Sequence, residues 1–172
     1  NTNLDRRSIR NVSSDDIPEC DGIIGGPPCQ SWSEAGALRG IKDKRGQLFF
    51  EYIRILRDKR PKFFLAENVS GMLAGRHSDA LENIKKLFVE SGYSLSFALL
   101  NAVDYGVPQD RKRVFFIGIR NDLCFSFVFP KQLEHKFVLK DIIFDIQKSA
   151  LPAKEKQKTN GNNCSIPNHE YK

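Results

Sequence analysis

The prediction of the fold starts from residues 23–33, IIGGPPCQSWS. An apolar run ends in Gly25 and Gly26, which is typical of a buried strand followed by a loop. Two prolines then fix φ and leave the loop few conformations, while the glycines let another molecule approach the backbone. The stretch therefore predicts a strand whose end presents Cys29 on a rigid turn. The alternative is a tight turn in which this cysteine only packs.

Helix and strand patterns alternate after this turn. Residues 48–59, LFFEYIRILRDK, carry apolar side chains at helical spacing, and Pro61 follows them. Residues 62–69, KFFLAENV, have the pattern of a strand, and residues 77–91 repeat the helical pattern up to the stop at Gly92. Such alternation predicts an α/β fold, a parallel sheet with helices on its faces.

Two strands without a helix between them close the series. Residues 94–101 and 113–120 are strand-like, and the polar, turn-rich residues 102–112 join them, which predicts an antiparallel final hairpin. After Pro130 the patterning fades, and residues 152–164 are polar and rich in lysine. We therefore predict one domain over residues 1–130 and a connector within residues 131–172.

Composition narrows the class of protein. The chain has 172 residues, of which 40% are hydrophobic and 28% charged, as in a folded globular domain. No apolar run is long enough to span a bilayer, and no secretory signal pattern is present. The net charge of +6 suits a polyanionic partner such as nucleic acid. The four cysteines lack metal-ligand spacing, so we expect free thiols, a reducing cytoplasm and no metal site.

Polar residues stand at three places that a parallel sheet brings together. Ligands of such sheets bind beyond the carboxyl ends of the strands. Cys29 follows the first predicted strand, Glu67 and Asn68 close the second, and Arg111 and Arg113 lead into the last. We therefore expect these side chains at one edge of the sheet.

Each of these residues has a functional and a purely structural interpretation. A carboxylate such as Glu67 is costly at the end of an apolar strand unless it has a partner or a task, and it can then donate a proton. The alternatives are a surface glutamate just past the strand and, for Asn68, a turn former. Arg111 and Arg113 point the same way on an extended chain and could hold an anion or a carbonyl oxygen, or form a solvated basic face.

The ordered motifs GGPPCQSWS, ENV and QDRKR, with two β-α units between them, resemble the bacterial cytosine-C5 DNA methyltransferases. The segments RGQLFFEYIRIL (45–56) and LLNAVDYGVPQDRKRVFFIGIR (99–120) fit the same family, so the resemblance covers about residues 20–120. Within the family, residues 20–34 and 158–171 look most like enzymes that modify GGCC. The resemblance implies a Rossmann-like, S-adenosylmethionine-dependent methyltransferase sheet.

The resemblance also implies a mechanism and its residues. Cys29 corresponds to the nucleophile that attacks carbon 6 of a cytosine flipped out of double-stranded DNA. Glu67 would hold the exocyclic amine and protonate ring nitrogen 3. Arg113 would contact the carbonyl oxygen of the base, with Arg111 supporting the pocket. Carbon 5 would then take the methyl group of S-adenosylmethionine.

Further positions match the family's binding residues. The implied substrate-binding residues are Pro28, Gln30, Ser33, Arg45 and Asn68, and the implied cofactor-binding residues are Pro28 and Leu48. Residues 31–46 correspond to the loop that closes over DNA in the family, and their basic side chains suit phosphate contacts.

Part of the family pattern is missing. The glycine-rich loop after the family's first strand and the acidic residue after its second are not in this sequence. We therefore expect the central part of a longer enzyme, with residues 131–172 leading into a target recognition domain, and no activity from this length alone.

The expected partner is double-stranded DNA, in the bacterial cytoplasm, with no membrane and no metal. We also expect a monomer and a possible cognate restriction endonuclease. One alternative is a catalytically dead DNA-binding or interaction module that keeps the fold. A weaker one is a thiol hydrolase pairing Cys29 with His77, His135 or His169, none of which has an evident companion carboxylate.

Overall fold

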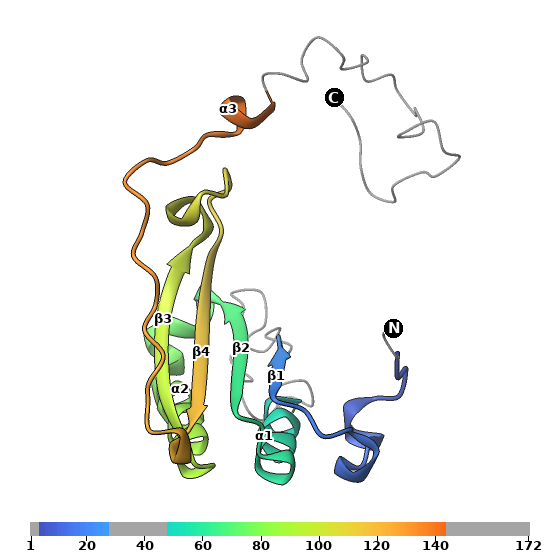
Figure 1. The fold of residues 1–172 in the computed structure, drawn as a ribbon. Helices are drawn as coiled ribbons and strands as arrows, with labels where there is room; N and C mark the ends of the chain where they lie inside the picture. Colours follow the sequence, from blue (N-terminus) through green and yellow to red (C-terminus); the bar gives the residue numbers. More distant parts are fainter. Residues whose placement is uncertain (1–3, 28–47, 144–172) are drawn as a thin grey trace, which may run out of the picture. The chain divides into compact units, whose positions relative to one another are not determined.

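A computed structural model describes residues 4–27 and 48–143 of the chain. The chain divides into two compact units, residues 1–136 and residues 137–172. The second unit contributes one described helix, α3 (Leu139–Ile143). All the strands and the two long helices belong to the first unit (Figure 1). The domain boundary expected near residue 130 stays a prediction.

The first unit is built on a four-stranded sheet with the order β1-β2-β4-β3 (Figure 1). Its strands are β1 (Gly22–Gly25), β2 (Phe63–Val69), β3 (Tyr93–Asn101) and β4 (Lys112–Arg120). β1 and β2 are parallel, whereas β4 is antiparallel to both β2 and β3. The predicted mixed sheet, parallel at one end and closed by an antiparallel hairpin, is therefore confirmed.

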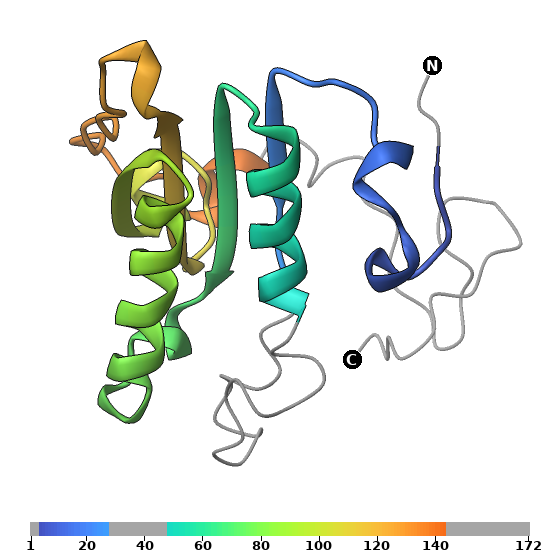
Figure 2. The ribbon, with the colours of Figure 1, turned by 90° about the horizontal axis from the view of Figure 1, so that it is seen from below.

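Two helices cover one face of this sheet, as Figure 2 shows from below. They are α1 (Leu48–Lys59) and α2 (Ser78–Glu90), both close to their predicted bounds. α1 ends because Arg60 adopts a positive φ of 46° and Pro61 cannot continue the helix. α2 ends at Glu90, two residues before Gly92, whose φ of 92° is open to glycine without strain.

Short 3-10 turns connect the longer elements. They are η1 (Ile9–Asn11), η2 (Ser14–Asp16), η4 (Ser70–Leu73), η5 (Gly75–His77), η6 (Ala102–Tyr105) and η7 (Asn121–Leu123). In the described ranges, 4–27 and 48–143, we find no helix with the length and apolar character needed to cross a bilayer.

Aromatic rings fill the space between the sheet and the helices. Phe64 of β2 is fully buried and stacks on Phe88 of α2, with 4.4 Å between the ring centroids. Tyr93 packs against the edge of the Phe64 ring at 5.1 Å, so this ring is confined on two sides. Gly118 of β4 lies against it, since a Cβ built there would be 2.0 Å from Cε1 of Phe64.

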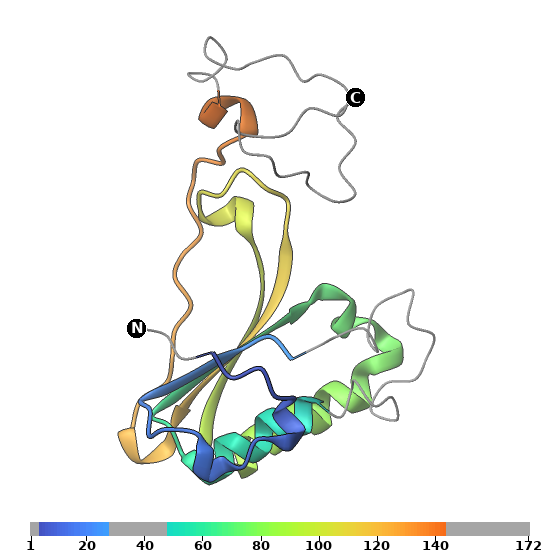
Figure 3. The ribbon, with the colours of Figure 1, turned by 90° about the vertical axis from the view of Figure 1, so that its right-hand side faces the viewer.

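A chain segment after β4 lies along the other face of the hairpin. Residues 124–136 run beside β3, on the opposite side of the sheet from α1 and α2 (Figure 3). Ser94 and Ser126 are hydrogen-bonded at 2.8 Å, and the hydroxyl of Ser96 donates to the carbonyl of Phe127 at 2.5 Å. Lys136 lies 2.6 Å from the buried carboxylate of Asp104, which fixes the segment to the turn at η6.

We expect Gly118→Ala to lower the free energy of unfolding by about 1–3 kcal/mol, because its methyl group would overlap the confined Phe64 ring. The matched control is Gly75→Ala, where an added Cβ meets nothing within 4 Å and which should stay within about 0.5 kcal/mol of the parent. Urea unfolding of the three proteins measures both effects. Equal stabilities for the two variants would contradict the packing described for Phe64.

Candidate active site

Three chain segments meet at one edge of the sheet. The parallel register pairs Gly25 with Ala66, so the carboxyl ends of β1 and β2 lie at the same edge. The antiparallel register pairs Val69 with Arg113, which brings the start of β4 to that edge as well. The convergence expected for Glu67, Asn68 and Arg113 is therefore present in the structure.

Glu67 and Arg113 form an ion pair at this edge. Nε of Arg113 lies 2.8 Å from Oε1 of Glu67, and their side chains are 25% and 35% exposed, respectively. Glu67 lies opposite Phe115 in the ladder, so both partners point to the face that α1 and α2 leave uncovered. The guanidinium offsets the cost of holding a carboxylate at the end of an apolar strand and fixes its orientation.

The other oxygen of Glu67 is directed toward the turn after β1. A Cβ built on Gly26 would lie 3.4 Å from Oε2 of Glu67 and 3.7 Å from its carbonyl oxygen. These are ordinary van der Waals distances, so an added methyl group would touch Glu67 without displacing it. The turn after β1 therefore lies directly against Glu67 at the end of β2.

Asn68 is almost fully buried beside this pair, with 2% of its surface exposed. Its Nδ2 donates to the carbonyl of Pro27 at 3.2 Å, and its Oδ1 accepts from the backbone N–H of Val69 at 2.9 Å. The side chain therefore joins the end of β2 to the segment that follows β1. The buried amide is satisfied by backbone groups, as burial demands.

Tyr52 of α1 contacts both β1 and β2 through its hydroxyl group. Its hydroxyl lies 3.1 Å from the carbonyl of Ile23 and 3.0 Å from the carbonyl of Leu65. Its ring covers Gly25, where a Cβ would lie 2.8 Å from Cε2. In the pattern of residues 48–59, Tyr52 stands only as one of the apolar helix positions. The signal overlooked there is a phenol on a buried helix face, whose O–H needs a partner.

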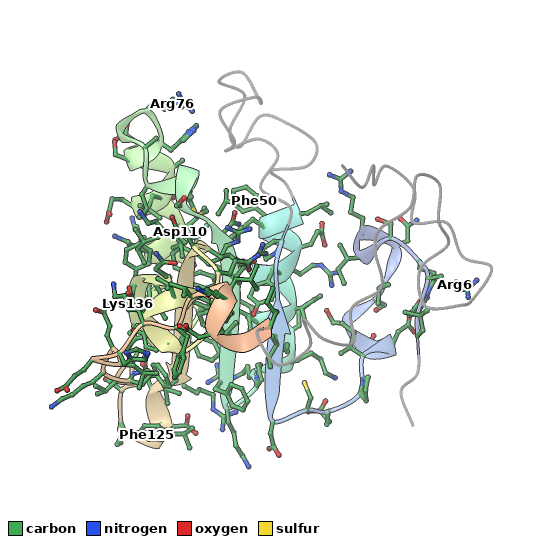
Figure 4. The ribbon with its side chains drawn as sticks, turned by 90° about the horizontal axis from the view of Figure 1, so that it is seen from above. Arg6, Phe50, Arg76, Asp110, Phe125 and Lys136 are labelled. Carbon is green, nitrogen blue, oxygen red and sulfur yellow. The ribbon has the colours of Figure 1, made fainter. Side chains whose placement is uncertain are left out.

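The turn before β4 is organised by Asn101, the last residue of β3. Its Oδ1 accepts from the backbone N–H of Arg111 at 2.9 Å, and its Nδ2 donates to Oδ1 of Asp110 at 2.7 Å. Figure 4 labels Asp110 among the side chains seen from above this edge. Gly106, with a φ of 85°, makes the preceding bend possible. Asn101 is not among the residues that the sequence predicts at this site.

Basic side chains surround a polar hollow next to the ion pair. Arg111 lies just ahead of β4 and is exposed, as is Lys112, whereas Arg113 is partly buried. The hollow has a volume of about 330 Å³ and is lined by Ser70, Gln109, Asp110, Arg111, Lys112 and Arg113. Beside the Glu67–Arg113 pair, Arg111 and Lys112 add two positive charges against the single carboxylate of Asp110, which favours an anionic ligand here.

Several predicted site residues cannot be placed at this edge. Cys29, Pro28, Gln30, Ser33 and Arg45 lie outside the described residues. Leu48 is the first residue of α1 and is partly exposed, so its apolar side chain is accessible to a ligand. Within residues 4–27 and 48–143, no three His, Cys, Asp or Glu side chains are grouped as metal ligands would be.

A family model described as C-5 cytosine-specific DNA methylase matches residues 1–172. The chain is 56% identical over 171 residues to the type II methyltransferase M.FnuDI of Fusobacterium nucleatum, covering 98% of this chain and 50% of that protein. It is 57% identical over 175 residues to M.NgoPII of Neisseria gonorrhoeae, covering 99% and 51%. The chain thus spans about half the length of these relatives.

A solved structure has a similar fold. The DNMT2 of Spodoptera frugiperda, determined as an E260A/E261A/K263A mutant, superposes with a TM-score of 0.58 at 27% identity. The superposition covers 79% of this chain and 42% of that one.

Two buried tyrosines predict how stability depends on alkaline pH. Burial raises the pKa of Tyr93, whose hydroxyl donates to the carbonyl of Pro61 at 2.9 Å, to about 12, and burial also raises the pKa of Tyr52. Since both folded pKa values exceed the ordinary value of 10.0, their stabilising contribution is complete below pH 10 and is lost as pH rises above it.

We therefore expect the free energy of unfolding to fall between pH 10 and about pH 12, and to fall less steeply in Tyr93→Phe, by up to about 1.4 kcal/mol per pH unit. Comparing the parent with the variant removes the shared contribution of lysines that titrate in the same range. Urea unfolding at several pH values, with tyrosinate absorbance as a second probe, measures the difference. If the free energy of unfolding falls equally with pH in the two proteins, ionisation of Tyr93 does not destabilise the folded state.

Proposed function

Because this chain belongs to the C-5 cytosine-specific DNA methylase family, we propose that it forms the catalytic core of an enzyme that methylates carbon 5 of cytosine in double-stranded DNA. The observation that supports this most is the Glu67–Arg113 pair, 2.8 Å apart, at the edge where the chain leads into Cys29. Family membership supports the reaction, and the pair supplies an oriented carboxylate and a cation at the edge from which the chain continues toward the proposed nucleophile.

The proposed reaction begins at carbon 6, because carbon 5 of cytosine is a poor nucleophile. The thiolate of Cys29 forms a bond to carbon 6, and the electron pair that is displaced makes carbon 5 enamine-like. S-adenosylmethionine, when bound, supplies a methyl group without its bonding electrons. After methylation the proton on carbon 5 leaves to a base, the sulfur–carbon 6 bond breaks, and the thiolate is regenerated.

Glu67 and Arg113 would act on the other side of the ring. The carboxyl of Glu67 accepts a hydrogen bond from the exocyclic amine and donates a proton to nitrogen 3 as carbon 6 is attacked. The same proton returns from nitrogen 3 to Glu67 when the thiolate leaves. Arg113 holds Glu67 by its Nε and leaves other guanidinium hydrogens for the carbonyl oxygen of the base. Arg111, exposed at the rim, adds positive potential.

The cofactor would bind beside the same edge. Leu48 is an apolar side chain, partly exposed at the start of α1, and suits contact with a nucleoside. With Pro28 it forms our proposed cofactor contact in this chain. The remaining contacts would come from the rest of the protein, since the chain spans about half the length of its relatives.

DNA is the proposed polyanionic partner. The target base must leave the stack to reach a thiol, and methyltransferases are among the enzymes for which such flipping is established. The basic hollow of Arg111, Lys112 and Arg113 offers phosphate contacts next to the base site, to which Gln30, Ser33 and Arg45 would add others.

We assign GGCC as the target on residues 20–34 and 158–171, which resemble enzymes with that specificity. The relatives M.FnuDI and M.NgoPII are named as type II methyltransferases. A cognate restriction endonuclease in the bacterial cytoplasm is therefore proposed, with the methyltransferase acting as a monomer.

The test is transfer of a tritiated methyl group from S-adenosylmethionine to a GGCC duplex by the full-length polypeptide. Glu67→Gln should lower the rate by about 10²–10⁴-fold, because the variant cannot donate the proton. Glu82→Gln, an exposed position on α2, is the control and should leave the rate unchanged. DNA binding without methyl transfer by the parent protein would instead support the catalytically dead module.

A further inference from the structure

The strand ladder between β1 and β2 stops where the chain turns toward Cys29. The last paired residues are Gly25 and Ala66, and the next positions along the same register place Pro27 opposite Asn68. A parallel ladder needs backbone N–H donors, and neither Pro27 nor Pro28 has one. Pro27 therefore donates no backbone hydrogen bond to β2, and its backbone can bond there only through its carbonyl oxygen.

The side chain of Asn68 supplies the donor for this carbonyl. Its Nδ2 donates to the carbonyl of Pro27 at 3.2 Å. Its Oδ1 is fixed at the same time by the N–H of Val69 at 2.9 Å, so the amide cannot rotate freely. With 2% exposure, the contact is shielded from water, which strengthens it.

Neighbouring groups fix the residues just before this contact. The Tyr52 hydroxyl reaches the carbonyl of Ile23 at 3.1 Å, and its ring lies under Gly25. The backbone is thus held at Ile23 and Gly25 by α1 and at Pro27 by Asn68. The Asn68 contact is the last of these, two residues before Cys29 in the sequence.

We infer that Asn68 is a positioning residue for Cys29 and makes no contact with the substrate. The inference rests on the proposed function, and it replaces the substrate-binding role that the family resemblance implies for Asn68. Both ends of its amide are engaged by backbone groups. The residue acts through the Pro27 carbonyl, by fixing the direction in which the chain leaves β1.

Asn68→Asp is the sharpest test, because it keeps the size of the side chain and the oxygen that accepts from Val69. It replaces the donor with an oxygen facing the Pro27 carbonyl, so this tie is lost. Asn83→Asp makes the same chemical change at an exposed position of α2 and is the matched control.

The measurements, on the full-length polypeptide, are the single-turnover methyl-transfer rate, the Kd for a GGCC duplex and the Tm. We expect Asn68→Asp to lower the rate by about a hundredfold, as a shift of about 1 Å in a reacting group can. The Kd for DNA should stay within about twofold of the parent, because no substrate contact is removed. Asn83→Asp should match the parent in all three.

An unchanged rate in Asn68→Asp overturns the inference, and so does a weakened Kd with an unchanged rate, which would mark a substrate contact. If the variant does not fold, Asn68→Ser, which removes the donor without adding a charge, takes its place. If neither variant folds, Asn68 is required for folding of the protein as a whole, and this result also overturns the inference.

The rate of Cys29 alkylation by iodoacetamide separates this inference from the proposed function. Failure of the parent protein to transfer methyl groups would end the proposed function. The alkylation rate would still report whether Asn68→Asp alters the setting of the thiol. An alkylation rate equal to that of the parent, in a protein that does methylate DNA, would contradict the positioning role alone.

Discussion

The pairing of β4 with β2 is the constraint on which the rest of the site depends. β4 runs antiparallel between β2 and β3, and its register places Arg113 opposite Val69. Only with this register does the guanidinium reach Glu67, two residues earlier on β2. A slip by one residue would turn Arg113 to the helix-covered face and leave the carboxylate without its cation. The register is in turn fixed by packing, since Gly118 must lie against the Phe64 ring.

Much of this architecture could be predicted from the sequence. Hydrophobic periodicity fixed the helices 48–59 and 77–91 to within a residue or so at each end, and the absence of a helix between residues 101 and 113 predicted the hairpin. The meeting of Glu67 with Arg113 followed from a topological rule, that strand ends of one polarity share an edge. These features depend on patterns that are local or on general properties of sheets.

Other features could not be predicted, because they depend on contacts between residues far apart in the chain. Nothing near Asn68 indicates that its amide bonds to Pro27, forty-one residues earlier in the sequence. In the sequence Tyr52 is one more apolar position of a helix, and nothing nearby indicates that its hydroxyl bonds to carbonyls of β1 and β2. The organising bonds of Asn101 likewise exist only once the hairpin has formed. Periodicity identifies which face is buried, not which polar atom meets which.

We propose that Cys29, Glu67 and Arg113 act together on one flipped cytosine. The most direct test is the intact mass of the full-length polypeptide after incubation with S-adenosylmethionine and a GGCC duplex carrying 5-fluorocytosine, because fluorine at carbon 5 blocks the final elimination. We predict a covalent protein–DNA adduct that maps to Cys29 and is absent in Cys29→Ser. An adduct that persists in Cys29→Ser, or methylation of ordinary DNA with no adduct on the fluorinated duplex, would contradict this proposal.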